Sequence, residues 1–297
     1  MRSRAAIVAV VLALAAGAAA DGSATRSAPA PPCGIARRAP HVYRHVLLLV
    51  LENHAFTEVA GSSPYLTGLA RSCGLADRYF AVAHPSLPNY LALTSGSTDG
   101  ISSDCTACSV SARSLFEQVG AGWRSYLESL PSRGYTGASS GDYAKRHNPA
   151  AYYARIAARY ATNAVPLESR TAGLLHDLAR DRLPRFALIV PNLCHDEHDC
   201  SVATGDAWLR RYVPRILRSR AYRAGGTALF VTYDEGTGAD NRVYTVVASA
   251  TTRPGTVVST RFDHYSLLRT IESLLGLPCL AHACGSGTAS MRAGFGL

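Results

Sequence analysis

The sequence His84-Pro85-Ser86-Leu87-Pro88-Asn89-Tyr90 places one serine between two prolines and runs on into the small-residue apolar segment 91–96. Proline fixes its own φ and disfavours the helical conformation in the residue before it. We therefore expect a stiff, non-helical turn followed by the start of a helix. A hydroxyl at that point faces backbone N–H groups and the positive end of the helix dipole, which favour an anion. Ser86 is accordingly a candidate nucleophile toward a phosphate; a capping serine in a proline-rich surface turn is the simpler alternative.

The N-terminus has the parts of a secretory signal peptide. A basic start at 1–4 precedes an apolar run over 5–20, and Ala18-Ala19-Ala20 fits a small-residue cleavage site. We predict a signal peptide over 1–20, cleaved near Ala20, and hence a secreted protein. The apolar run is short for a membrane span, which needs ~20 residues, so we expect no transmembrane segment.

Composition narrows the classes of fold and partner. The chain has 297 residues, of which 47% are hydrophobic, and a formal net charge of +9. This size suits one large domain or two small ones with a full core. Arginines are scattered through 155–185 and 210–223 without interleaved aromatic residues, so we expect no nucleic-acid partner. A basic excess is otherwise typical of a solvated face, or of attraction to anionic lipids and phosphorylated substrates.

Eight cysteines, an even number, follow the predicted export signal. In an exported chain this favours disulfides over free thiols or a zinc–cysteine site. The short spacings predict bridges Cys105–Cys108, Cys194–Cys200 and Cys279–Cys284, and we expect the remaining Cys33 and Cys73 to pair. A redox or zinc-binding role for Cys105-Thr106-Ala107-Cys108 is the alternative.

Continuous apolar runs of strand length predict buried strands, because strands covered on both faces have no polar side. These runs are 46–51, 186–190, 227–233 and 243–250. Helical patterns cover 112–119, 123–130, 150–161, 172–182, 207–218 and 266–275, and a polar glycine-rich loop covers 134–147. The alternation predicts an α/β fold with a largely parallel central sheet flanked by helices. We expect a disordered leader over 21–40, a single domain over 41–285 and a C-terminal tail over 286–297.

Polar clusters follow three of the predicted strands. Glu52-Asn53-His54 comes directly after the first, Asn192 with 195–199 after the second, and Asp234-Glu235 after the third. Ligands bind outside the carboxyl ends of strands in open α/β sheets, so we expect these segments to converge. Crowded carboxylates need a compensating cation, and oxygen and imidazole ligands suit a divalent metal. Each cluster alone has a simpler explanation, as a helix cap, a turn or a solvated hairpin.

Five motifs occur in a recognisable order: Val50-Leu51-Glu52-Asn53-His54-Ala55-Phe56, 84–90, Asn192-Leu193-Cys194-His195-Asp196, Thr232-Tyr233-Asp234-Glu235-Gly236 and Asp263-His264-Tyr265-Ser266. Together they resemble the bacterial phosphoesterase family of acid phosphatases and phospholipases C, within the alkaline-phosphatase-like superfamily. The resemblance covers about residues 42–278 and implies an alkaline-phosphatase-like fold. It also implies a divalent metal ion and a phosphomonoester substrate. Because the short form with a signal is similar to secreted mycobacterial acid phosphatases acting on phosphatidylinositol 3-phosphate, phosphoinositide head groups at a membrane surface are one candidate substrate.

The resemblance assigns metal ligands to a set of matched positions: Glu52, Asn53, Asp234, Glu235 and His264. Asp196 and His198 stand where two-metal branches of the superfamily take ligands for a second ion. Glutamate as the first ligand and the Asp-Glu pair depart from the aspartate and Asp-His of other branches. The identity and number of metal ions therefore stay open.

The resemblance also assigns catalytic roles. Ser86 corresponds to the nucleophile, Asn89 to a residue that helps to hold the phosphoryl group, and His147 to a motif residue that contacts phosphate. In the implied chemistry a metal lowers the pKa of the serine hydroxyl, the alkoxide attacks phosphorus, and water later cleaves the phosphoserine. Either His195 or His198 is expected to protonate the leaving group.

We thus expect a secreted, metal-dependent phosphomonoesterase of the acid phosphatase type. A phospholipase C-type phosphodiesterase is the first alternative; larger family members of that type carry extra C-terminal domains, and this chain ends about twenty residues after Leu277. A non-catalytic secreted binding protein is the second alternative. The presence of ligand residue types at every matched position argues against it.

Overall fold

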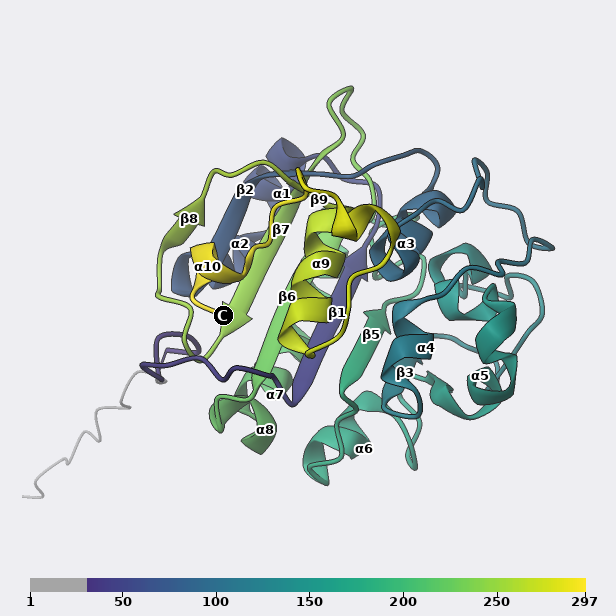
Figure 1. The fold of residues 1–297 in the computed structure, drawn as a ribbon, viewed down its shortest axis with the longest axis horizontal. Coiled ribbons are helices and arrows are strands. Elements are labelled where there is room, and N and C mark those ends of the chain that lie inside the picture. Colours follow the sequence, from purple (N-terminus) through teal and green to yellow (C-terminus); the bar gives the residue numbers. More distant parts are fainter. Residues whose placement is uncertain (1–30) are drawn as a thin grey trace, which may run out of the picture. The chain divides into compact units, whose positions relative to one another are not determined.

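The computed structural model describes residues 31–297, so the predicted signal peptide and the leader up to residue 30 lie outside it. One mixed sheet forms the centre, with strands in the order β4-β3-β5-β1-β6-β7-β2-β8 and β9 paired to β2. Helices cover both faces: Figure 1 shows α9 in front of the central strands and α7 behind them. The fold is the expected α/β class, with a largely parallel sheet flanked by helices.

The three central strands carry the site. β1 (His45–Leu51) pairs parallel with β5 (Phe186–Val190) on one side and with β6 (Thr227–Tyr233) on the other. Their side chains are buried almost throughout, which explains the continuous apolar runs. β7 (Arg242–Ser249) is antiparallel to both β6 and β2 (Gly74–Phe80). The four predicted strands agree with the structure to within one residue at each end.

Five strands of the described chain were not predicted, and β3 and β2 are the longest of them. The helix predicted over 123–130 is wrong, because Trp123–Leu127 form β3, which pairs parallel with β5. Its five residues are too few for periodicity to separate strand from helix, and four of them are buried. β2 was not anticipated because Asp77 and Arg78 interrupt its apolar pattern. The remaining short strands are β4 (Ala164–Pro166), β8 (Thr256–Val258) and β9 (Phe262–Asp263).

The helices within residues 31–297 are α1 (Phe56–Ser62), α2 (Pro64–Ser72), α3 (Ser86–Ser95), α4 (Leu115–Val119), α5 (Ala157–Asn163), α6 (Leu174–Ala179), α7 (Val202–Arg218), α8 (Arg220–Arg223), α9 (His264–Leu274) and α10 (Arg292–Phe295). Single 3-10 turns lie at Lys145–His147, Pro149–Ala151, Ala154–Ile156 and Ala281–Cys284. The helix predicted over 150–161 is therefore two 3-10 turns followed by α5. None of the helices in this part of the chain is long and apolar enough to cross a membrane.

The non-helical turn predicted over 84–90 is wrong over most of its length, because helix α3 already begins at Ser86. Ser86 is its first residue, and Pro88 stands in its first turn, where the missing N–H breaks no intrahelical hydrogen bond. Gly96 ends the helix in the left-handed conformation, with φ of 77°, and a Cβ there would lie 2.4 Å from Leu280 O. All ten residues of α3 are buried. The helix is thus fixed at both ends and along its sides, which fixes the position of Ser86.

All four predicted disulfides are present, and no described cysteine is free. One of them anchors part of the segment expected to be a disordered leader: Cys33 is fully buried and bonded to Cys73. Ala36 N also donates to Ala250 O at 2.8 Å. The expected C-terminal tail likewise packs on the core, through Met291 and Phe295. Both chain ends of the described part are held by buried side chains that composition alone did not reveal.

Candidate active site

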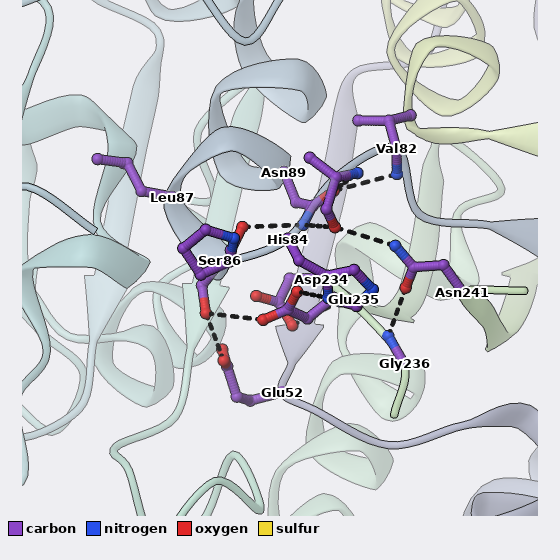
Figure 2. A network of polar contacts seen from close by, with 12 residues as sticks. Glu52, Val82, His84, Ser86, Leu87, Asn89, Asp234, Glu235, Gly236 and Asn241 are labelled. Atoms are coloured by element: carbon purple, nitrogen blue, oxygen red, sulfur yellow. Dashed lines mark hydrogen bonds and ion pairs between the residues drawn. The ribbon is translucent and has the colours of Figure 1, made fainter. Parts of the chain in front are cut away.

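Ser86 stands between two carboxylates at the carboxyl ends of the central strands. Its Oγ donates to Glu52 Oε1 at 2.5 Å and lies 3.4 Å from Glu235 Oε1 (Figure 2). Glu52 follows β1 directly, and Glu235 is the second residue after β6. All three residues are at least 95% buried. The structure therefore brings the predicted nucleophile together with residues from two of the three predicted polar clusters.

Asp234 completes the first acidic cluster. Glu52, Asp234 and Glu235 each place an oxygen within 4.8 Å of the others. Asp234 Oδ1 accepts from the backbone N–H of Glu235 at 2.6 Å, while its Oδ2 is buried without a partner. Burial, with the repulsion of Glu52, raises the pKa of both Asp234 and Glu235 above their usual values. These carboxylates are difficult to ionise at the same time unless a positive charge lies among them.

His147 joins Glu52 to a second acidic residue. Its Nδ1 lies 3.0 Å from Asp196 Oδ2 and its Nε2 2.8 Å from Glu52 Oε2, and its ring stacks on Tyr90. Burial opposes a charge on the imidazole, but Glu52 and Asp196 raise the pKa of His147 to about 9. Burial opposes ionisation of Glu52, but His147 and the hydrogen bond from Ser86 hold the pKa of Glu52 below its usual value. Glu52, His147 and Asp196 also form a second group able to hold a metal.

A divalent cation fits the residues present. Glu52 Oε2, Asp234 Oδ2 and His147 Nε2 are buried and have no hydrogen-bond partner, since the Glu52–His147 approach lacks the alignment of a hydrogen bond. Leaving such groups unpaired is costly, and carboxylate oxygens with imidazole are ordinary metal ligands. A metal on His147 requires the neutral ring, whereas a protonated His147 supplies a positive charge itself. Because both clusters contain Glu52, the charge held in one cluster affects the other.

Asn53 follows Glu52 in the left-handed conformation, with φ of 54°, which asparagine tolerates better than most residues. Its side chain is half-buried and makes no hydrogen bond to another described residue. Its amide oxygen is thus free for a ligand role, which stays a prediction.

His264 does not offer a nitrogen to either cluster, contrary to the predicted ligand role. Its Nε2 lies 2.6 Å from the Asp234 carbonyl oxygen, which can only accept, so this nitrogen carries the proton. Its Nδ1 then accepts from the Tyr79 hydroxyl at 2.9 Å. Burial lowers the pKa of His264 to about 4, which keeps the ring neutral. The residue supports the backbone that carries Asp234 and does not face the cluster.

Asn89 is also used differently from the prediction. Its Oδ1 accepts from Val82 N at 3.1 Å and Ala83 N at 3.0 Å, and its Nδ2 donates to Ala83 O at 2.8 Å and Pro85 O at 3.2 Å. Figure 2 shows the amide turned toward this loop. No donor remains for a phosphoryl group, so Asn89 shapes the turn that presents Ser86.

His195 and His198 hold positions on the disulfide-closed loop 194–200. His195 Nδ1 lies 3.0 Å from Glu128 Oε2, and His198 Nδ1 lies 2.7 Å from Asp199 Oδ1. Neither ring contacts Ser86 or its carboxylates within the described residues. A role as proton donor to the leaving group stays a prediction for both.

Sequence reasoning missed two residues that organise the site. His84 Nδ1 pairs with Glu235 Oε2, on the side of Glu235 away from Ser86. Asn241 Oδ1 accepts from Gly236 N at 2.8 Å, and its Nδ2 donates to Ala83 O at 2.9 Å, so it ties the loop after β6 to the turn before α3. His84 lies inside the motif quoted first, whereas nothing in the sequence marks Asn241.

Comparison with known proteins shows which family the chain matches. Residues 62–278 match the model of the Phosphoesterase family. The chain is 33% identical over 264 residues to the phosphatidylinositol-3-phosphatase of Mycobacterium tuberculosis, covering 85% of this chain and 84% of that protein. It is 30% identical over 253 residues to an acid phosphatase of Aspergillus fumigatus, covering 80% of this chain but 56% of that protein.

A solved structure supports the fold. A protein in the alkaline phosphatase superfamily from Vibrio parahaemolyticus superposes with a TM-score of 0.51 at 12% identity, covering 80% of this chain and 67% of that one. At this identity the likeness concerns the fold alone. The family model spans most of the chain, and the mycobacterial relative is matched over more than four-fifths of both lengths. This chain belongs to the Phosphoesterase family.

Proposed function

We propose that the protein is a secreted, metal-dependent phosphomonoesterase of the acid phosphatase type, which acts through Ser86 and a phosphoserine intermediate. Membership of the Phosphoesterase family makes it a hydrolase of phosphoric esters. The observation that carries the finer proposal is the contact of Ser86 Oγ with Glu52 Oε1 at 2.5 Å, inside a cluster of buried carboxylates with unpartnered oxygens.

The residues around Ser86 prepare its hydroxyl to attack. Ser86 begins α3, where the positive end of the helix dipole favours the negative charge that develops on and near Oγ. Glu52 Oε1 accepts the hydroxyl hydrogen and fixes the direction of Oγ. Glu235 stands next to Oγ and contacts the exposed ring of His84, which provides a route for the proton to solvent.

A metal would be held by Glu52, Asp234 and Glu235, and the Asn53 amide oxygen would be a further ligand. Such an ion, when bound, supplies a Lewis acid that lowers the pKa of the serine hydroxyl and stabilises charge on the phosphoryl oxygens. The chain itself sets the ligand geometry: Glu52 N donates to Asp196 O at 2.8 Å, and Asp234 N donates to Leu51 O at 3.0 Å. His264 holds the Asp234 carbonyl from the other side.

Export and substrate class complete the proposal. The predicted signal peptide and the four disulfides support secretion, since disulfides persist outside the cytosol. The name of the mycobacterial relative makes phosphatidylinositol 3-phosphate the first lipid substrate to test. Small soluble phosphomonoesters are the second class.

One assay separates the proposal from its alternatives. The purified chain is given p-nitrophenyl phosphate or p-nitrophenylphosphorylcholine, with and without a chelator. We expect metal-dependent hydrolysis of the first substrate and at most slow hydrolysis of the second. Preference for the second substrate would indicate a phospholipase C, and hydrolysis of neither by metal-loaded protein would indicate a binding protein.

A further inference from the structure

Arg146 lies beside the site and has no part in the chemistry described so far. It precedes His147 in the 3-10 turn Lys145–His147, and its side chain is 19% exposed. Its Nε lies 3.5 Å from Asp104 Oδ2, and its Nη2 lies 3.0 Å from His198 Nε2. These are its polar contacts within residues 31–297.

The contact with His198 fixes the hydrogen-bond pattern around the guanidinium. Arginine can only donate, so His198 Nε2 accepts, and the ring proton sits on Nδ1, where it donates to Asp199. Arg146 donates one N–H of Nη2 to His198 and directs its Nε toward Asp104 in an ion pair. Three of its five N–H groups, including both at Nη1, have no partner in the described chain.

Three connections place this guanidinium near Ser86. Asp104, which pairs with Arg146 through Oδ2, accepts through Oδ1 from the backbone N–H of Leu87 at 2.9 Å, next to Ser86. His147 follows Arg146 directly and reaches Glu52, the partner of the Ser86 hydroxyl. His198, the acceptor from Arg146, donates its own backbone N–H to Asp196 of the second cluster at 2.9 Å.

Its neighbour Lys145 is directed elsewhere. Lys145 Nζ donates to Thr106 O at 2.7 Å and lies over the ring of Tyr152. The Lys145 ammonium is thus engaged, whereas Arg146 keeps N–H groups without a partner in the described chain.

We propose that Arg146 binds two non-bridging oxygens of the substrate phosphoryl group and thereby selects phosphomonoesters over phosphodiesters. This inference rests on the proposed function. A monoester at neutral pH carries two negative charges on three terminal oxygens, whereas a diester carries one charge on two. A guanidinium pairs with phosphate oxygens through two parallel N–H···O bonds, so its contribution grows with the charge and the number of free oxygens. Asp104 and His198 engage Nε and one N–H of Nη2, so both N–H groups of Nη1 and the second one of Nη2 stay available to a ligand.

The test compares Arg146→Gln and Arg146→Lys with a matched control, Arg155→Gln. Arg155 is half-exposed and pairs with Glu117 on the surface, so its loss leaves the site unchanged. The metal-supplied full mature chain is assayed with p-nitrophenyl phosphate and bis(p-nitrophenyl) phosphate. For Arg146→Gln we expect kcat/KM to fall about 10- to 100-fold for the monoester and less than about threefold for the diester. Arg146→Lys keeps the charge without the fork and should fall between wild type and Arg146→Gln.

A second readout keeps this inference separate from the proposed function. Calorimetry measures the dissociation constants of inorganic phosphate and dimethyl phosphate for the same variants, and circular dichroism checks their fold. If the wild type hydrolyses neither ester, the proposed function fails, but a dissociation constant for phosphate raised at least about tenfold in Arg146→Gln still supports the inference. Should Arg146→Gln not fold, Arg146→Lys takes its place in both readouts. An equal loss of affinity for phosphate and dimethyl phosphate, or no loss of affinity for phosphate, would overturn the inference about Arg146.

Discussion

Replacing Ser86 with alanine removes one hydroxyl and tests whether that hydroxyl is the nucleophile. The fold should survive, because α3 does not use the Ser86 side chain as a cap. The loss is one hydrogen bond to a buried carboxylate, about 1–3 kcal/mol, or roughly 2–12 °C in Tm for a chain of this size. Folding and activity can therefore be read separately in this variant.

The expected fall in turnover is on the order of 10³-fold or more, since the covalent route is lost. A thousandfold change corresponds to about 4 kcal/mol of transition-state stabilisation. A hydrogen bond to a charged group contributes about 1.5–3 kcal/mol, so a hydroxyl that only oriented Glu52 would give a fall of at most about 10²-fold. The size of the effect thus distinguishes a nucleophile from a positioning group.

Two variants serve as controls. Ser86→Thr retains the hydroxyl and should keep more activity than Ser86→Ala, although its extra methyl enters a buried site. Ser95 lies at the other end of α3, where its Oγ hydrogen-bonds Leu91 O and Asp99 Oδ2, so Ser95→Ala should lower stability by about 1 kcal/mol and leave turnover nearly unchanged. Mass spectrometry of an acid-quenched reaction should find phosphate on the peptide that contains Ser86. Near-wild-type turnover in Ser86→Ala, or phosphate on a histidine, would refute the reasoning.

Further expectations concern the metal, pH, disulfides and export. Asp234→Asn should lose bound metal and activity together, by elemental analysis and assay, and full activity of metal-stripped wild type would contradict the site. The pKa of His147 in the folded protein is raised to about 9, so its contribution to stability is fully present below its unfolded pKa near 6.5 and is lost as pH rises through 9. The unfolding free energy of protein stripped of metal by a chelator should therefore fall over this range, and it should fall less in His147→Gln. Replacing Cys194 and Cys200 with serine should lower the unfolding free energy by ~2 kcal/mol and reduce activity, because the bridge closes the loop that bears Asp196. An unchanged rate would show that this loop does not position the site. N-terminal sequencing of secreted protein should find a start just after Ala20, and a mature chain beginning at Met1 would exclude the predicted cleavage.

The central strands could be predicted because their environment is uniform. Strands buried on both faces favour apolar side chains throughout, and β1 and β5 are apolar over nearly their whole length. β6 and β7 are largely apolar, with the buried polar residues Thr227, Thr232, Thr245 and Ser249. β2 lies further out, and its polar residues hide it. β3 is as buried as a central strand but spans only Trp123–Leu127, and so short a segment fits either period.

Some features of the site could likewise be predicted from the sequence, and others could not. Glu52 and Asp234–Glu235 were predictable because parallel strands deliver the residues that follow them to one edge of the sheet, whatever the rest of the chain does. What each atom faces was not predictable, because it depends on contacts between segments far apart in sequence. Asn89 stands three residues from Ser86, yet the preceding loop takes all its hydrogen-bonding capacity. His264 is saturated by Tyr79 and the Asp234 carbonyl. A residue's type and spacing indicate that it belongs to the site, but only its unused donors and acceptors show whether it can touch the substrate or only hold the residues that do.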